Sequence, residues 1–221
     1  MEEKLERPVK LITAICDYFS EVSKDLRTPT MIELQLMEET KKVSRTDGLT
    51  GLFNRRFFDE TLEGEINRVQ RYDGNFTLIF FDLDNFKKLN DTQGHQAGNL
   101  SLKRAAEIMK LEKRTEDIAC RYGGEELVLI LPKTQKINAL VIAERIRQKL
   151  EEAELEFEGK SFRVTLSGGV VSYPLDAQDT KSLIHAADIA LYQAKDSGKN
   201  RIYLHALNKW HYIRIDFAGK V

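Results

Sequence analysis

Short apolar runs bounded by polar turns are the feature of this sequence that most restricts its fold. Residues 76–82 read FTLIFFD and residues 127–131 read LVLIL, runs too short for a membrane span and too continuously apolar for a surface helix. We predict that both are buried strands. Gly123 and Gly124 make a tight turn between residues 118–122 and 127–131, so these two segments are expected to pair as a hairpin.

Helical patterns separate these strands. They cover residues 52–71, 99–112, 137–152 and 180–195. Further strands are predicted at residues 162–173, interrupted at Gly168 and Gly169, and at residues 201–204. Strands separated by helices, with one hairpin among them, predict an α/β sandwich in which helices pack on a central mixed sheet.

The two ends of the chain differ from this central part, which we place at residues 46–205. Residues 1–45 are predicted to be helical, with an apolar stripe suited to a partner helix at Ile12, Ile15, Phe19, Val22 and Leu26. These helices either pack on the body of the protein or form a dimerising connector that carries a signal. The tail, residues 206–221, alternates like an edge strand, and it equally fits the first strand of a lost domain.

Composition excludes several classes of protein. The 34 Lys and Arg residues nearly balance 35 Asp and Glu residues, which argues against a nucleic-acid platform or a polybasic membrane binder. No apolar run is long enough for a membrane span, and the first ten residues lack the apolar core of a signal peptide. Cys16 and Cys120 fit no metal-binding spacing and are expected to be reduced thiols, so we expect a cytoplasmic protein.

Acidic residues follow the first predicted strand. Asp82 ends a rigid buried strand and is well placed to bind a hard cation such as Mg²⁺. Asp84 is expected to cap the following helix, so that the amides of Asn85, Phe86 and Lys87 face outward as an anion site. The alternative is that both aspartates are helix caps and nothing binds there.

The predicted hairpin carries two more acids at its tip. Glu125 and Glu126 follow Gly123 and Gly124, and these glycines permit positive φ and the close approach of a large ligand. Glu125 beside Asp82 would make a two-carboxylate site for a divalent metal and a triphosphate.

Five motifs in order resemble the GGDEF domain of diguanylate cyclases. They are DGLTGLFNRR at 47–56, FFDLDNFKKLND at 80–91, GHQAG at 94–98, RYGGEEL at 121–127 and AKDSGKN at 194–200. Leu127 stands where the family usually has phenylalanine. The resemblance implies a nucleotidyl-cyclase or palm-like fold. It also implies a bacterial signalling enzyme that condenses two GTP into cyclic di-GMP and two pyrophosphates, as a homodimer with two Mg²⁺, or Mn²⁺, per site.

The resemblance also assigns roles to single residues. Asp82, the Leu83 carbonyl and Glu125 are implied metal ligands, and Glu125 is also the candidate base. Glu126 is implied to support the metals or the hairpin, and Lys87 to stabilise charge on the phosphates. The implied substrate contacts are Asn85, Phe86, Asn90, His95, Asn99, Lys195 and Lys199. For His95, Asn90 and the two lysines, the alternatives are a structural histidine, a turn residue and helix-dipole partners.

Two departures from the family bear on substrate binding. Asn99 replaces the usual aspartate; a carboxylate accepts from both guanine donors, whereas an amide satisfies only half of that edge and matches adenine instead. We therefore expect weakened guanine selectivity, with a mixed GMP–AMP dinucleotide as one outcome. Lys199 replaces the usual arginine and loses its bidentate geometry.

A second ligand site is implied upstream of the hairpin. Arg114 and Asp117 resemble the family's RxxD inhibitory site, and Arg145 matches an additional arginine that clasps the same product. A surface salt bridge and an exposed helix cation are the alternatives. If Asn99 and Lys199 prevent turnover, the protein would instead be a receptor for cyclic di-GMP.

Overall fold

The structure is a computed structural model in which residues 45–205 and 211–212 are described. The chain divides into two units, and nearly all described residues belong to the second, which starts at Thr46. The helices predicted within residues 1–45 lie outside the described residues, as do Ile213, Ile215 and Phe217 of the tail.

A six-stranded mixed sheet forms the centre of the domain, in the order β2-β3-β1-β6-β7-β8. All neighbouring strands are antiparallel except β6 and β7, which are parallel. The strands are β1 (Phe76–Leu83), β2 (Ile118–Arg121), β3 (Glu126–Pro132), β6 (Leu166–Tyr173), β7 (Ile202–Leu204) and β8 (His211–Tyr212). The central strand β1 is buried along its whole length, as its apolar sequence requires.

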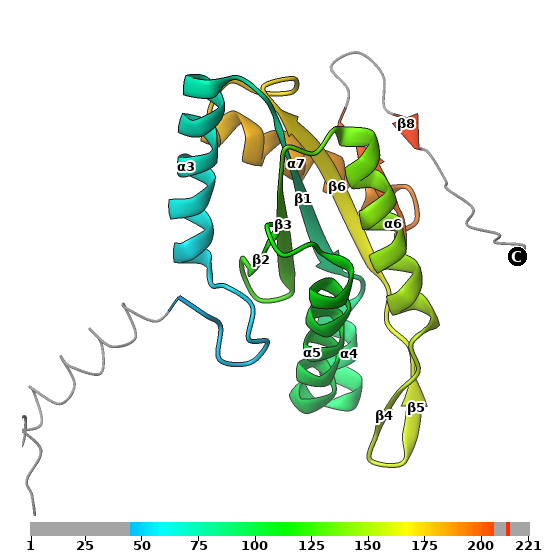
Figure 1. Cartoon of the computed structure of the whole chain (residues 1–221). Helices are drawn as coiled ribbons and strands as arrows, with labels where there is room; N and C mark the ends of the chain where they lie inside the picture. Colours follow the sequence, from blue (N-terminus) through cyan, green and yellow to red (C-terminus); the bar gives the residue numbers. More distant parts are fainter. Residues whose placement is uncertain (1–44, 206–210, 213–221) are drawn as a thin grey trace, which may run out of the picture. The chain divides into compact units, whose positions relative to one another are not determined.

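Helices cover both faces of this sheet (Figure 1). They are α3 (Arg55–Tyr72), α4 (Phe86–Gln93), α5 (His95–Glu112), α6 (Lys136–Glu152) and α7 (Thr180–Asp196). Successive side chains of a strand point to opposite faces, so β1 contributes to two cores. Ile79 and Phe81 pack in one core with α5 and α6, whereas Leu78 and Phe80 pack in the other with α3 and α7. The predicted α/β sandwich with a central mixed sheet is confirmed.

Two details of the strands differ from the prediction. Gly168 and Gly169 do not interrupt β6, because both are paired with β1 in a continuous ladder. A Cβ atom on Gly169 would lie 2.5 Å from the backbone of both Ala187 and Leu191, so the glycine lets α7 approach the sheet closely. The strand predicted at residues 162–173 is instead broken between Phe162 and Leu166. A short hairpin of β4 (Leu155–Phe157) and β5 (Lys160–Phe162) precedes β6.

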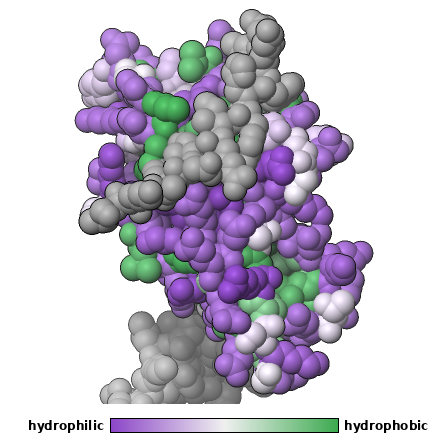
Figure 2. Space-filling view, turned by 90° about the vertical axis from the view of Figure 1, so that its right-hand side faces the viewer, coloured by the Kyte–Doolittle hydropathy of each residue, from purple (hydrophilic) through white to green (hydrophobic). Residues whose placement is uncertain are grey.

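The described surface gives no sign of a membrane span. No helix in the described ranges combines the length and the apolar character that crossing a bilayer requires. The face of the molecule in Figure 2 is largely hydrophilic, with small separated hydrophobic areas.

Candidate active site

An aspartate–lysine pair lies at the end of the central strand. Asp82 is the last residue but one of β1, and the residue is only 7% exposed. Lys195, in the last turn of α7, places its Nζ atom 2.8 Å from Asp82 Oδ2. Opposing influences act on the pKa of the Asp82 carboxyl group. Burial raises its pKa to about 6, the charge of Lys195 opposes this, and the charges of Glu125 and Glu126 add to it.

The acidic hairpin is brought beside Asp82 by the pairing of β1 with β3. Glu126, the first residue of β3, stands directly opposite Asp82, and the Leu83 amide donates to the Glu125 carbonyl at 3.4 Å. Burial raises the pKa of Glu126, as does the charge of Glu125. The predicted juxtaposition of positions 82 and 125 is therefore present, and it joins three carboxylates with one lysine.

The glycines of the hairpin do not use the positive φ that glycine permits. Neither Gly123 nor Gly124 has a positive φ. A Cβ atom on Gly123 would lie 2.6 Å from Glu126 Oε2, so a glycine at position 123 leaves room for the Glu126 carboxylate. A Cβ atom on Gly124 would meet no atom within 4 Å, so open space surrounds the tip of the hairpin.

Arg121 holds the hairpin from its base. Its guanidinium donates to the Gly124 carbonyl at 2.8 Å and pairs with Asp47 Oδ2 at 3.1 Å. Partial burial works against ionisation of Asp47, but hydrogen bonds from Thr50 and the charge of Arg121 outweigh it and lower its pKa. The turn that contains Asp47 is thereby connected to the acidic tip.

Asp84 does not cap α4, which corrects our prediction. The N-cap residue is Asn85, in the left-handed conformation with φ 56°, and its side chain makes no capping hydrogen bond. Asp84 is instead buried and accepts hydrogen bonds from the hydroxyls of Thr165 and Ser167, each at 2.7 Å. Partners that are far away in sequence outcompete the local helix end for this carboxylate.

The predicted phosphate contacts are partly brought together. Lys199 donates its ammonium to the Asn85 side-chain carbonyl, which places a cation at the start of α4. Phe86 follows there and is half-buried against the core. Lys87 is exposed on α4, and no hydrogen bond or ion pair joins it to another residue within the described ranges. The structure therefore leaves Lys87 available but does not place it on the carboxylates.

Asn90 lies in a tight contact between α4 and α5. Its Oδ1 atom is buried and has no hydrogen-bond partner among the described residues. It lies so close to Gly98 that a Cβ atom there would be 2.0 Å away. A buried carbonyl without a donor is costly, so this oxygen keeps an unused capacity to accept a hydrogen bond.

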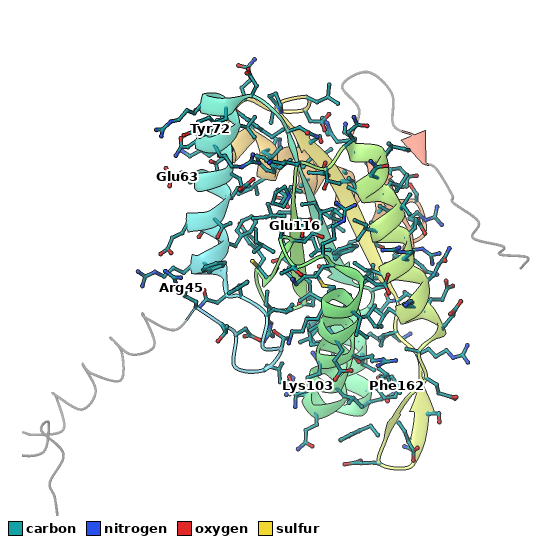
Figure 3. All side chains as sticks on the ribbon, in the orientation of Figure 1. Arg45, Glu63, Tyr72, Lys103, Glu116 and Phe162 are labelled. Carbon is teal, nitrogen blue, oxygen red and sulfur yellow. The ribbon has the colours of Figure 1, made fainter. Side chains whose placement is uncertain are left out.

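Asn99 and His95 are both exposed on α5. Asn99 lines a shallow pocket of about 540 Å³ together with Gln96, Leu100, Lys103, Phe157, Leu49 and Glu156. Figure 3 shows Lys103 and Phe162, which mark α5 and the β4–β5 hairpin, at the same end of the domain. Asn90 does not line this pocket, and no described contact places His95 near the carboxylates.

Two of the residues predicted for product binding, Arg114 and Asp117, lie outside this cluster and flank Glu116, which is labelled in Figure 3. The Asp117 carboxyl group is buried and accepts from the Arg114 amide at 2.7 Å, while its Oδ1 atom has no partner within the described part of the chain. The Arg114 side chain is exposed and makes no ion pair with Asp117 or with other described residues. Arg145 is exposed on α6 and pairs with Glu112 at 3.0 Å.

The sequence reasoning missed Asp188 on α7. Burial raises the pKa of Glu126, and the charge of Asp188 raises it further, so Asp188 lies near the hairpin. Arg55 lies over the ring of Tyr122 at 4.3 Å and opposes this effect. A signal was available, because Asp188 precedes Lys195 by two helical turns and residues at that spacing share one face.

The carboxylates of this cluster are the donors that a divalent cation would use. No group of three or more His, Cys, Asp or Glu side chains arranged to hold a metal ion occurs in the described ranges. Asp82 and Glu125 supply two carboxylates, and their repulsion contributes to the raised pKa of Asp82. A cation would relieve that repulsion, and nucleotide phosphates can complete a coordination sphere of oxygen atoms, so these residues fit one.

Fold and site together define a cyclase-like α/β domain, in which an acidic hairpin and lysines gather at one end of a mixed sheet. Residues 44–201 match the family model described as diguanylate cyclase, GGDEF domain. The chain belongs to this family.

Curated and solved relatives support this assignment. Diguanylate cyclase A of Treponema denticola is 36% identical over 198 residues, which is 87% of this chain and 52% of that protein. The GGDEF domain of DgcB from Caulobacter crescentus, solved with c-di-GMP, is 31% identical with a TM-score of 0.69, covering 73% of this chain and 93% of that one. An active GGEEF domain from Vibrio cholerae is 30% identical with a TM-score of 0.66, covering 70% and 98%. This chain spans about half or less of the curated relatives' length.

Proposed function

We propose that this protein is a diguanylate cyclase that condenses two GTP molecules into cyclic di-GMP and releases two pyrophosphates. The observation that carries the proposal is the cluster of Asp82, Lys195, Glu125 and Glu126 at the end of β1, in a chain of the GGDEF family. Such a cluster combines carboxylates for cations with a lysine for phosphate, which phosphoryl transfer requires.

Each half of the reaction forms one phosphodiester bond. The 3′-hydroxyl oxygen of one GTP attacks the α-phosphorus of the other, the bond from that phosphorus to the α–β bridging oxygen breaks, and pyrophosphate leaves. The hydroxyl proton passes to a base, for which Glu125 is our candidate. Because the two nucleotides attack each other, two domains must face each other, and we propose a homodimer.

Asp82, the Leu83 carbonyl and Glu125 would hold divalent cations, with two Mg²⁺ per site as our proposal and Mn²⁺ as a substitute. When bound, these cations neutralise charge on the phosphates and increase the acidity of the attacking hydroxyl. Glu126 would help to hold the metals or order the hairpin, and its position opposite Asp82 supports this role. Lys195 would exchange its partner Asp82 for the γ-phosphate once cations occupy the carboxylates.

The remaining contacts orient the nucleotide. Lys199 and the amides of Asn85 and Phe86 at the start of α4 would bind phosphate oxygens, with Lys87 stabilising developing charge. Asn90 and Asn99 would bind the base, with His95 close to the nucleoside. The support for Asn90 is that its Oδ1 atom has no internal hydrogen bond, so accepting one from a guanine donor would break no existing contact.

We further propose product inhibition by cyclic di-GMP bound at Arg114 and Asp117, with Arg145 added from the partner subunit of the inhibited assembly. The exposed guanidinium of Arg114 and the partnerless Asp117 Oδ1 leave both residues able to take a guanine and a phosphate.

The test is product analysis of purified protein incubated with Mg²⁺ and GTP. We expect cyclic di-GMP and pyrophosphate from the wild type and none from Asp82→Asn or Glu125→Gln. As a control, both variants should still bind added cyclic di-GMP, because Arg114 and Asp117 are unchanged. A wild type that binds cyclic di-GMP tightly and makes none would replace the cyclase by the receptor.

A second test concerns which purine base the protein accepts. Asn99 lies exposed at its pocket, where its amide can donate as well as accept. Products from GTP, ATP and their mixture should be compared for wild type and Asn99→Asp. Mixed dinucleotide from the wild type alone would support relaxed specificity, whereas strict GTP use by both proteins would remove that idea.

A further inference from the structure

A buried arginine on α6 contacts the loop that carries Lys199. Arg147 is largely buried, and its Nε atom donates to Glu144 Oε2 at 2.7 Å. Glu144 is itself only 1% exposed. Burying two charges is costly unless their hydrogen bonds are satisfied, so this pair has to be held by further partners.

The same guanidinium reaches two more acceptors. Arg147 Nη1 donates to Glu151 Oε2 at 2.7 Å and to Asn200 Oδ1 at 2.8 Å. Asn200 Nδ2 donates in turn to Glu151 Oε1 at 2.7 Å. These three hydrogen bonds close a ring that fixes the Asn200 side chain against α6.

The backbone at Asn200 requires such support. Lys199 has φ 64° and Asn200 has φ 48°, so two successive residues with side chains adopt the left-handed region. That conformation is disfavoured for residues other than glycine and persists where surrounding contacts hold it. Because Lys199 reaches Asn85 from this loop, the conformation decides where its ammonium lies.

The network continues to the end of β1. The Asn200 amide donates to Asp84 Oδ2 at 2.9 Å, and Asp84 is anchored by Thr165 and Ser167. Asp84 lies two residues after Asp82. One continuous set of hydrogen bonds therefore runs from α6 through the lysine loop to the strand that carries the carboxylates.

We infer that Arg147, together with Glu144, is a positioning residue that holds residues 198–201 in the conformation that presents Lys199 to the nucleotide triphosphate. The inference rests on the proposed function for its substrate. Arg147 touches no reacting atom and acts through Asn200. Its planar fork is needed, because Nε and Nη1 serve three acceptors on two sides, whereas a lysine ammonium cannot span the same geometry.

The test is Arg147→Lys, which keeps the charge beside Glu144 and removes the fork. We expect the KM for GTP to rise by about tenfold with kcat changed by less than about threefold, because substrate contact is lost rather than the reacting groups. Amide hydrogen exchange in residues 198–201 should become faster. Affinity for 3′-deoxy-GTP, which lacks the attacking hydroxyl, should fall by the same factor as KM rises.

Arg68→Lys is the matched control, because Arg68 also pairs with a glutamate three residues away, on α3, and has no contact with the loop. It should leave nucleotide affinity and loop exchange unchanged. Asn200→Ala removes the other end of the bridge and should reproduce the effect without disturbing the Arg147–Glu144 pair. Adding it to Arg147→Lys should then cause little further loss.

These measurements separate the two proposals. If the wild type makes no cyclic di-GMP, the proposed function fails, while exchange and 3′-deoxy-GTP binding still decide the role of Arg147. Unchanged exchange and affinity in both Arg147→Lys and Asn200→Ala would overturn the inference. Equal losses in Arg68→Lys would overturn it too, because a general loss of stability would then explain them.

Discussion

Gly98→Ala is a perturbation whose sign should depend on a single neighbouring side chain. An added Cβ atom would lie 2.0 Å from Asn90 Oδ1 and 3.0 Å from Phe86 Cζ, whereas ordinary contact begins at 3.4 Å. The Asn90 amide would have to move by about 1.4 Å to reach that distance. Substrate contact through this amide would be lost with that movement.

The expected change in the free energy of unfolding for Gly98→Ala follows from two opposing contributions. Alanine in place of glycine inside a helix stabilises it by about 1 kcal/mol. Inserting a methyl group into a packed site costs about 1–3 kcal/mol. The net change for Gly98→Ala is therefore a destabilisation of up to about 2 kcal/mol, which corresponds to a Tm decrease of up to about 8 °C for a domain of this size.

The same substitution should become neutral or stabilising when Asn90 is also replaced by alanine. The main overlap then disappears while the helical gain remains, and Asn90→Ala removes a buried carbonyl that has no partner among the described residues. Thermal unfolding of the four proteins of this double-mutant cycle gives the coupling directly. All three variants lack a correctly placed Asn90 amide, so each should show a KM for GTP raised by about tenfold.

The reasoning is refuted if Gly98→Ala destabilises equally with and without Asn90. It is also refuted if Gly98→Ala leaves both Tm and the KM for GTP unchanged, because the overlap would then have no consequence.

Three further predictions concern other parts of the domain. The lowered pKa of Asp47 means that its ionised form stabilises the fold above the unfolded-state value of 3.8, and this contribution is lost as the pH falls through the folded-state pKa. The stability difference between wild type and Asp47→Asn should thus be full at neutral pH and shrink as the pH falls below 3.8, as urea midpoints can show; a constant difference would contradict this. Burial raises the pKa of Cys120 to about 12, so peptide mapping should find it alkylated by iodoacetamide only after unfolding, and rapid labelling of the native protein would refute this. Arg114→Ala should lose inhibition by cyclic di-GMP with little change in Tm, since its side chain is exposed, and full inhibition in this variant would remove the inhibitory site.

Local sequence was sufficient for most elements of the fold. The apolar run of β1 and the helical periodicity of α7 were predicted to within a few residues, because the burial of each element depends on its own pattern. The hairpin of β4 and β5 was not predicted, since its strands are three residues long and carry charged side chains. Such short strands give almost no periodic signal.

The candidate site, too, was only partly predictable from the sequence. The motifs identified Asp82, Glu125 and Lys195 as residues of one site, but they could not show that Lys195 would bind Asp82. The prediction that Asp84 caps α4 was wrong, because the distant hydroxyls of Thr165 and Ser167 outcompete the local helix end for its carboxylate.

Sequence by itself determined which segments become the long strands and helices, since hydrophobic periodicity and turn residues act over a few positions. Only the tertiary structure decided which polar groups are satisfied by one another, as Asn200 and Asp84 are across 116 positions of the chain. The physical reason is that desolvation and hydrogen bonding depend on which groups burial brings together, and no local pattern contains that information.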